Sequence, residues 1–276
     1  MNRTLKKSLW PIVIGIGAVM TVFWICFAGP LQPMAPTGPT ARTLDQAQLP
    51  SVPIQVDIEN MTRSLSVIVV EVEPRRVSDS SPTRIKLAIR NDYLAGVVAF
   101  ELVLPSGGKG RLTSLVDYFL SIDRPLGLQP EETIYKSILI PATLPPVVRV
   151  SGVLLADGDS DGEKRALSEL RSCREGQIFQ AEKAITMLCR WLSRSDLNVS
   201  VTDKLLMIRS EIDQLDQEGS NRQGPMYDSG LQYVRTYLQN WTDSILSDAR
   251  DESNMPDLEA IIRTRITALE RATSMK

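Results

Sequence analysis

The hydrophobic pattern of the chain changes its period once, at about Gly162, and this change limits the fold more than any other feature. Before it, from about residue 54, apolar residues tend to alternate with polar ones, as Ile85, Leu87 and Ile89 do in RIKLAIRN. A period of two is typical of β-strands, whose successive side chains point to opposite faces. We therefore expect strands before Gly162 and a different kind of structure after it.

Six or seven short runs of this kind follow one another within about a hundred residues, and Pro, Gly, Asn or Asp separates most of them. The runs are SLSVIVVEVEP, RIKLAIRN, GVVAFELVLP, LVDYFLSID, TIYKSILIP and VVRVSGVLLAD. No helical pattern lies between them, so residues 54–160 are expected to form an antiparallel, immunoglobulin-like β-sandwich. The stretch has neither the Cys pair nor the Trp that form the core of antibody domains. The term "immunoglobulin-like" therefore describes the architecture only.

After Gly162 apolar residues recur every three or four positions, the period of an amphipathic helix. The stripes are Ile178, Ala181, Ile185, Leu188 and Leu192; Leu205, Ile208, Ile212 and Leu215; Leu231, Val234, Leu238, Trp241 and Ile245; and Leu258, Ile262, Ile266 and Leu269. We expect residues 161–276 to form three or four helices in a bundle or in hairpins, with the stripes packed as a core. A partner-binding role for the stripes is the alternative. The predicted fold class is mixed, an all-β part followed by an all-α part.

The N-terminus has the features of a membrane anchor. Residues Leu9–Ala28 carry no charge and follow Arg3, Lys6 and Lys7. Twenty helical residues, at about 1.5 Å each, span the roughly 30 Å hydrocarbon core of a bilayer. We expect residues 1–29 to be an uncleaved transmembrane anchor with a cytoplasmic N-terminus and the bulk of the chain outside the cytoplasm. The alternative is a signal peptide cleaved after residue 28, which would release a secreted protein.

Residues 30–53 are rich in proline and poor in large apolar side chains. Such a segment buries no core, so we expect an extended, semi-rigid linker that holds the following part away from the membrane.

The amino-acid composition excludes several classes of function. The chain has 276 residues, no histidine, three cysteines and a formal net charge of −2. Without histidine there is no Ser-His-Asp or Cys-His catalytic system and no His-containing metal site. A near-neutral charge gives no reason to expect nucleic acid as a partner. Cys173 and Cys189 would lie about 24 Å apart on an unbroken helix, too far for a disulfide, so we expect free thiols.

The stretch ADGDSDGE contains the one candidate metal site. Asp157, Asp159, Asp161 and Gly162 occupy positions 1, 3, 5 and 6 of a helix-loop-helix calcium loop, where oxygen ligands and a glycine belong. Aspartate oxygens are ligands that Ca²⁺ prefers. These residues therefore form a candidate calcium site.

Other features of the same stretch favour a turn. Position 12, which should hold a bidentate glutamate, is Ser168, and Glu169 comes one residue late. A strand, not a helix, precedes the loop. Asp157 with the following glycine suits a turn at a strand end, and Asp161 suits the N-cap of the following helix. We expect the turn and keep calcium as the alternative.

The chain also bears a resemblance. A proline-rich linker, IKLAIRNDYLAGVVAFEL, LQPEET, VSGVLLADGDSDGE and a helical tail are together similar to uncharacterised families of bacterial secreted or membrane-anchored proteins. The similarity covers most of residues 54–220. It implies an immunoglobulin-like sandwich and a helical C-terminal region, and it implies no activity.

These observations predict a non-enzymatic, single-pass envelope protein that mediates binding or assembly outside the cytoplasm. Its partners would be the membrane, through residues 9–28, and an envelope protein or a second copy, through the helical part. The alternative is a calcium-stabilised adhesion or carbohydrate-binding module that uses Asp157, Asp159 and Asp161. A hydrolase that works through carboxylates alone is the third possibility.

Overall fold

The computed structural model describes residues 51–52, 54–73, 75–76, 82–105, 111–121, 124, 126–142, 144, 146–194, 199–215, 224–248 and 257–274. All described residues belong to one compact unit, Gln46–Lys276. The predicted anchor over residues 9–28 and nearly all of the predicted linker over residues 30–53 lie outside the described residues. Among the described helices, none combines the length and the apolar character needed to cross a bilayer.

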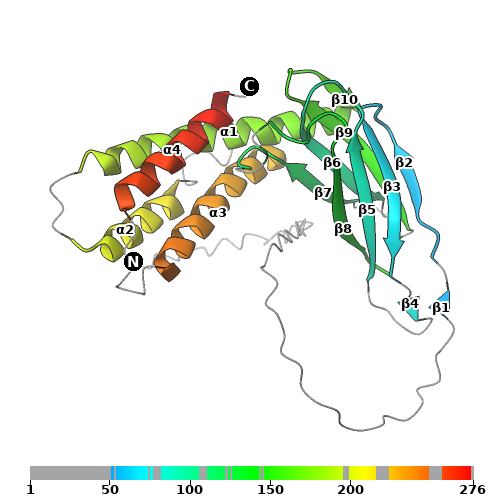
Figure 1. Ribbon diagram of the computed structural model, residues 1–276, viewed down its shortest axis with the longest axis horizontal. Coiled ribbons are helices and arrows are strands. Elements are labelled where there is room, and N and C mark those ends of the chain that lie inside the picture. The colour runs from blue at the N-terminus through cyan, green and yellow to red at the C-terminus, as the bar shows by residue number, and fades with distance from the viewer. Residues whose placement is uncertain are drawn as a thin grey trace, which may run out of the picture. The chain divides into compact units, whose positions relative to one another are not determined.

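The strand-bearing part contains two main sheets (Figure 1). The strands are β1 (Ser51–Val52), β2 (Asp57–Asn60), β3 (Leu65–Val72), β4 (Arg75–Arg76), β5 (Thr83–Asn91), β6 (Val97–Pro105), β7 (Arg111–Asp117), β8 (Thr133–Ile140), β9 (Val147–Leu155) and β10 (Ser160–Gly162). One sheet has the order β10-β9-β6-β7, with β2 also paired to β9, and the other has the order β3-β5-β8. The short strands β1 and β4 form a separate pair.

A single hydrophobic core joins the two sheets. Ile85, Leu87 and Ile89 on β5 are fully buried, and they pack with Phe100 and Leu102 of β6 from the other sheet. The alternation expected for RIKLAIRN is therefore confirmed, and the two sheets bury their apolar faces against each other.

Two details of the predicted strands are wrong. The sheets are not wholly antiparallel, because β2 runs parallel to β9. No hairpin links these two strands, so nothing in the connection forces opposite directions. The strand expected over residues 115–123 ends at Asp117, whose carboxylate accepts a hydrogen bond from the Phe119 N–H at 2.7 Å. Phe119 and Leu120 then pack in the core of the helical part, which explains why the apolar run continues past the strand.

Four helices follow the strands. They are α1 (Lys164–Leu192), α2 (Val201–Gln214), α3 (Pro225–Asp248) and α4 (Leu258–Ser274). Nearly all of the stripe residues expected from the sequence are buried in, or packed against, one core cluster; Leu231 is buried outside it. The prediction of core packing for the stripes is thus confirmed, and the described chain is a β-plus-α protein.

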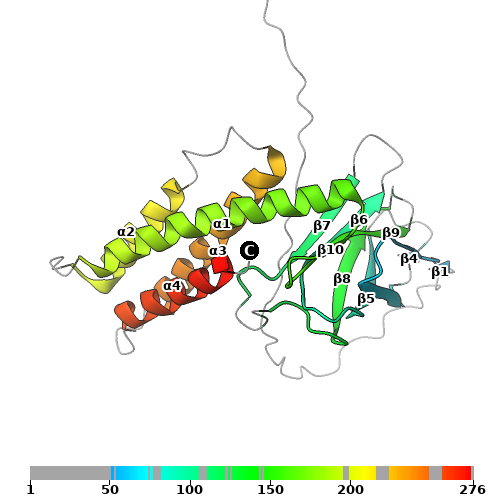
Figure 2. The same ribbon diagram turned by 90° about the horizontal axis from the view of Figure 1, so that it is seen from above.

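Helix α1 belongs to both parts of the compact unit. It contacts α3 and α4 along much of its length, and it also contacts β6, β9 and β10 (Figure 2). At its N-terminal end, Ala166 and Leu170 lie against Gly152 of β9, where a Cβ would be only 3.0 Å from the Ala166 Cβ. The glycine lets the helix lie close to the sheet, so α1 covers the outer face of the sheet that contains β9.

Candidate interaction surfaces

The acidic stretch forms a hairpin between β9 and β10, and its three aspartates have different roles. Asp161 lies in β10, not at the N-cap of α1 as predicted; the N-cap residue is Glu163, whose side chain makes no capping hydrogen bond. One oxygen of Asp161 accepts hydrogen bonds from the backbone N–H groups of Arg63 and Ser64 and from the Ser64 hydroxyl. Partial burial alone would raise the pKa of Asp161, but these hydrogen bonds outweigh it and lower the pKa below its ordinary value. Asp161 therefore ties the hairpin to the turn between β2 and β3.

The other two aspartates lie in the exposed turn. The Asp157 carboxylate accepts a hydrogen bond from the Asp159 N–H at 3.1 Å, and Gly158 between them has a φ of +91°. This confirms the turn geometry expected for Asp157-Gly158. The Tyr93 hydroxyl donates to Asp159 at 3.5 Å, and the negative charge of Asp159 is the largest cause of the raised pKa of Tyr93, with burial and Asp157 adding to it.

A calcium site remains a prediction. Among the described residues, no three acidic or cysteine side chains are arranged to hold a metal ion. Ser168, the residue at position 12 of the loop, lies within α1.

The hairpin shares one end of the two-sheet body with two exposed leucines. Leu94, in the turn between β5 and β6, is 95% exposed, and Leu126, between β7 and β8, is 55% exposed. A Cβ on Gly96 would lie 2.2 Å from the Leu126 carbonyl oxygen, so the two loops touch. The Ala156 N–H donates to the Gly96 carbonyl, which brings the hairpin beside them. Exposed aliphatic side chains and carboxylates therefore meet at this end.

The second exposed surface is the outer face of the β3-β5-β8 sheet, which we call the open face. Its central row, set by strand register, is Ile68 on β3, Ala88 on β5 and Tyr135 on β8. Ile68 is 62% exposed and Tyr135 is 65% exposed. Val70 and Leu139 on the two outer strands are exposed as well. Large apolar side chains thus stand in solvent on both sides of β5.

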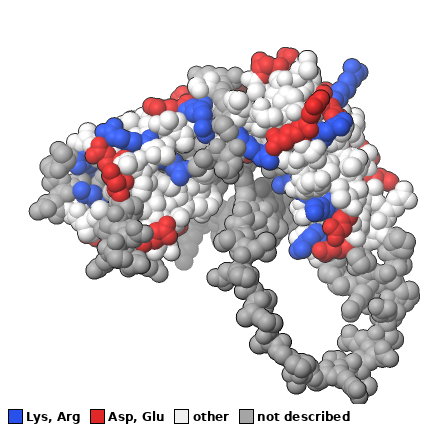
Figure 3. Space-filling model, viewed as in Figure 1, with Lys and Arg blue, Asp and Glu red and all other residues white. Residues whose placement is uncertain are grey.

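Cations run along the middle strand of the open face. Arg84, Lys86 and Arg90 occupy outward positions of β5, since they alternate with its buried residues. Arg84 pairs with Glu73 at 3.4 Å and Arg90 with Asp92 at 2.5 Å, in both cases with an exposed arginine. Over the surface seen in Figure 3, Lys and Arg are interspersed with Asp and Glu, with no large region of one sign.

A buried ion pair joins the sheet to α1. Arg174 of α1 donates to Asp117 at 2.9 Å, and their side chains are only 10% and 4% exposed. The guanidinium also lies over the Phe119 ring, 4.8 Å from its centre. The Gln177 amide donates to the other oxygen of Asp117 at 3.0 Å. This cluster is shielded from solvent and joins the two parts, so we assign it to architecture.

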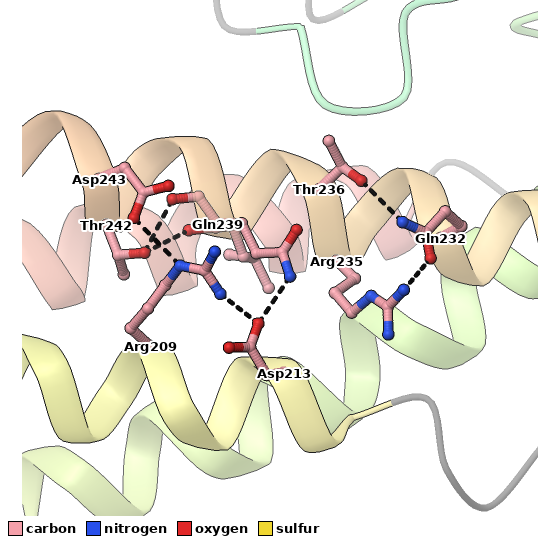
Figure 4. Close-up of polar contacts among 9 residues, drawn as sticks. Arg209, Asp213, Gln232, Arg235, Thr236, Gln239, Thr242 and Asp243 are labelled. Atoms are coloured by element: carbon pink, nitrogen blue, oxygen red, sulfur yellow. Dashed lines mark hydrogen bonds and ion pairs between the residues drawn. The ribbon is translucent and has the colours of Figure 1, made fainter. Parts of the chain in front are cut away.

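A polar cluster on the surface of the helical part joins α2 to α3 (Figure 4). Arg209 of α2 pairs with Asp213 one turn along and donates to Asp243 of α3 at 3.1 Å. Gln239 of α3 donates to Asp213 at 2.7 Å. The arrangement links the two helices side by side.

Both cysteines in α1 are free thiols, as predicted. Cys173 is buried, and burial raises its pKa to about 12. Cys189 is exposed. The Cys173 thiol is therefore protonated at neutral pH and unsuited to act as a nucleophile.

Comparison with protein-family models, with curated proteins and with solved structures finds no match to this chain.

Sequence reasoning singled out the acidic hairpin and missed the open face. Ile68 and Val70 lie in a continuous apolar run, VIVV, in which alternation does not show which residues point outward. The available signal was the basic side of RIKLAIRN, where Arg84, Lys86 and Arg90 mark the outer face of β5. Strand register was needed to place Tyr135 and Ile68 beside it.

Proposed function

We propose that this protein is a non-enzymatic, membrane-anchored envelope protein that uses the open face to hold a partner protein outside the cytoplasm. The anchor is the one predicted from residues 9–28. The strand-bearing part is an immunoglobulin-like sandwich, a proposal supported by the two sheets that share one core.

The proposal rests on a difference between the outer faces of the two sheets: helix α1 covers one of them, and no described element covers the other. The outer face of the sheet containing β9 packs Val98, Ala99 and Leu154 under Leu170 of α1. On the open face, no described element covers the outward side chains of Ile68 and Tyr135. Clustered exposed apolar side chains on a folded protein are typical of a protein-binding surface.

The test is crosslinking in living cells. The full-length chain is produced with the photoreactive residue benzoylphenylalanine in place of Tyr135, and in a matched control in place of Phe179, an aromatic residue of α1 that is 37% exposed. We expect a protein adduct from position 135 and none from position 179. The chain should be in the membrane fraction and be digested by protease added outside the cytoplasmic membrane. The absence of an adduct at 135, or protection from that protease, would overturn the proposal.

A second candidate, the calcium-stabilised adhesion or carbohydrate-binding module, has one supporting observation. The charges of Asp157, Asp159 and Asp161 all act on the Tyr93 hydroxyl and raise its pKa, so the three carboxylates produce a combined negative potential at one place. Such a potential attracts a cation. The melting experiment described below tests this candidate.

A further inference from the structure

We propose that Tyr237 of α3 and Arg265 and Arg271 of α4 form a binding site for a phosphate monoester group. The site belongs to the helical part and shares no residue with the open face, so it adds a ligand to the proposed function. A phosphate monoester is the chemistry shared by a small phosphorylated molecule and by a lipid headgroup such as that of phosphatidic acid.

The centre of the site is the guanidinium group of Arg265, which lies against two aromatic side chains of α3. Its Cζ atom is 4.8 Å from the centre of the Tyr237 ring and 5.1 Å from the centre of the Trp241 ring. Its Nη1 donates a hydrogen bond to the Tyr237 hydroxyl, and its Nε is buried without a hydrogen-bond partner. The rings and the hydroxyl are uncharged, so the positive charge of Arg265 is partly removed from water without gaining a negative partner.

Two other arginines that lie over aromatic rings show what Arg265 lacks. Arg174 pairs with Asp117 at 2.9 Å as well as lying over a ring. Arg194 pairs in the same way with Glu211 at 3.4 Å. Within the described part of the chain, Arg265 forms no ion pair, and burial lowers its pKa. A cation removed from water is costly unless it is paired, so the site is complete only with a bound anion.

Arg271 brings a second positive charge to the same place. Burial raises the pKa of Tyr237, and the charges of Arg265 and Arg271 both oppose this rise, so both guanidinium groups act on one hydroxyl. Arg271 is exposed, and its guanidinium makes only a long hydrogen bond of 3.4 Å, to the Ser121 carbonyl oxygen. No carboxylate of the described residues, including the neighbouring Glu270, is among the groups that shift the pKa of Tyr237 or Arg265.

The charges and donors of the site favour a phosphate monoester over a carboxylate. A phosphate monoester carries nearly two negative charges at neutral pH and matches two guanidinium groups, whereas a carboxylate would neutralise only one. Guanidinium groups also suit phosphate because they donate paired hydrogen bonds to its oxygens. The Nη2 of Arg265 and the Tyr237 hydroxyl proton have no acceptor among the described residues, so both can donate to the ligand. Tyr237 and Arg265 are partly exposed, so a ligand reaches them from solvent.

The experiment measures the binding of inorganic phosphate to the full-length protein in detergent by isothermal titration calorimetry. Arg265→Gln removes the central charge, Tyr237→Phe removes the hydroxyl and keeps the ring, and Arg271→Gln removes an exposed charge that the fold does not need. Arg263→Gln is the matched control, because Arg263 is an exposed arginine of the same helix that already pairs with Glu259. Circular dichroism shows whether each variant is folded.

We expect Arg265→Gln to weaken phosphate binding about tenfold or more, because hydrogen bonds between two charged groups are the strong ones. Arg271→Gln should weaken it about threefold or more, Tyr237→Phe should weaken it as well, and Arg263→Gln should leave it unchanged. Acetate, which has a single charge, should bind more weakly than phosphate. Each of three results would overturn the inference: no phosphate binding by the wild type, equal binding of acetate, or unchanged affinity in folded Arg271→Gln.

Two esters then identify the source of the phosphate group through the melting temperature, which a ligand of the folded state must raise. A rise with phenyl phosphate alone assigns the site to small phosphorylated molecules. A larger rise with phosphatidic acid than with phosphatidylcholine, lost in Arg271→Gln, assigns it to a lipid headgroup. Either result supports the site, whereas a protein that binds inorganic phosphate and neither ester would overturn the assignment to a monoester.

Discussion

Gly176 of α1 and Gly230 of α3 mark the place where the two helices touch backbone to backbone. A Cβ on Gly176 would lie 2.2 Å from the Tyr227 carbonyl oxygen, and a Cβ on Gly230 would lie 2.0 Å from the Cys173 carbonyl oxygen. Both clashing atoms belong to the backbone, which cannot rotate out of the way as a flexible side chain can. The pair therefore fixes how closely α1 and α3 approach, and with it the packing of the helical part.

Gly176→Ala and Gly230→Ala should each destabilise the protein. Alanine improves helix propensity by about 1 kcal/mol, but the clash forces the two helices apart, and overpacking costs typically about 1–3 kcal/mol or more. We expect the clash to prevail and the melting temperature of the full-length protein in detergent to fall by several degrees, roughly 2–4 °C for each kcal/mol. Circular dichroism at 222 nm, which reports helix content, measures it.

The matched control is Gly158→Ala. Gly158 also resists a Cβ, through its φ of +91°, but nothing lies within 4 Å of the added atom. Its effect should be limited to backbone strain of about 1 kcal/mol. Helix variants that melt no lower than this control would contradict the backbone contact.

The buried pair of Arg174 and Asp117 should be costly to break from one side. Arg174→Met leaves the Asp117 carboxylate buried without its cation, and removing one partner of a buried pair costs about 3–5 kcal/mol. The exposed pair of Arg263 and Glu259, with both side chains 64% exposed, provides the comparison. Arg263→Met should cost at most about 0.5 kcal/mol. Equal melting temperatures for the two variants would show that the ion pair of Arg174 and Asp117 does not stabilise the contact between α1 and the sheet.

Asp161 should make stability depend on acid. Its pKa is lowered in the folded protein from an ordinary value of 3.8. The stabilisation it provides is therefore complete above the ordinary value and is lost as the pH falls through the lower, folded value. Asp161→Asn should melt about 2–4 °C lower at neutral pH, for a loss of about 1 kcal/mol of hydrogen bonding.

The pH dependence of the melting temperature distinguishes the hydrogen-bonding role of Asp161 from the general effect of removing a carboxyl group. The melting temperature of Asp161→Asn should decline less steeply than that of the wild type between about pH 5 and pH 2. Asp157→Asn removes a carboxyl from the same hairpin that is not bonded to Arg63 or Ser64 and is the control. Identical slopes for Asp161→Asn and the wild type would contradict the assignment.

The two cysteines of α1 should differ in reactivity. The raised pKa and burial of Cys173 keep its thiol protonated and covered, whereas Cys189 is exposed. In the native protein at pH 8, iodoacetamide should modify Cys189 and leave Cys173 mostly unmodified. In denaturant the two should react alike. Peptide mass spectrometry measures both sites, and equal native rates would show that α1 opens readily near Cys173.

Calcium should leave the melting temperature unchanged. One oxygen of Asp161 already accepts three hydrogen bonds, and Asp157 holds the turn through the Asp159 N–H. A metal that binds only the folded state must raise the melting temperature once its concentration exceeds the dissociation constant. The comparison is about 2 mM calcium, in the range of weak extracellular sites, against chelator. A rise that Asp159→Asn abolishes would establish a site and favour the adhesion module.

Periodicity was sufficient to predict the two kinds of secondary structure. One face of each strand or helix is buried in a core, and the apolar residues mark that face. This explains the alternation of Ile85, Leu87 and Ile89 and the helical stripe of Leu205, Ile208 and Ile212. The parallel direction of β2 was not predictable in this way. Period two is the same in either direction, and the direction depends on a strand ninety residues away.

The candidate surface was harder to predict than the fold. Asp157, Asp159 and Asp161 attract attention because they are close in sequence, and the structure shows Asp161 of β10 accepting hydrogen bonds from the turn between β2 and β3. Ile68 and Tyr135 are far apart in the chain and meet only through the register of β5. A surface formed by register has no signature in a local motif.

The continuity of α1 also determines where the chain can be divided. This 29-residue helix contributes Leu170 to the cover of the β-sheet and Leu188 to the core of the helical part. A shortened protein that stops before Lys164 would leave Val98 and Leu154 uncovered, and one that begins there would present Leu170 without its sheet. The two parts should therefore be expressed together, because an expression boundary drawn where the strands end would cut through a shared core.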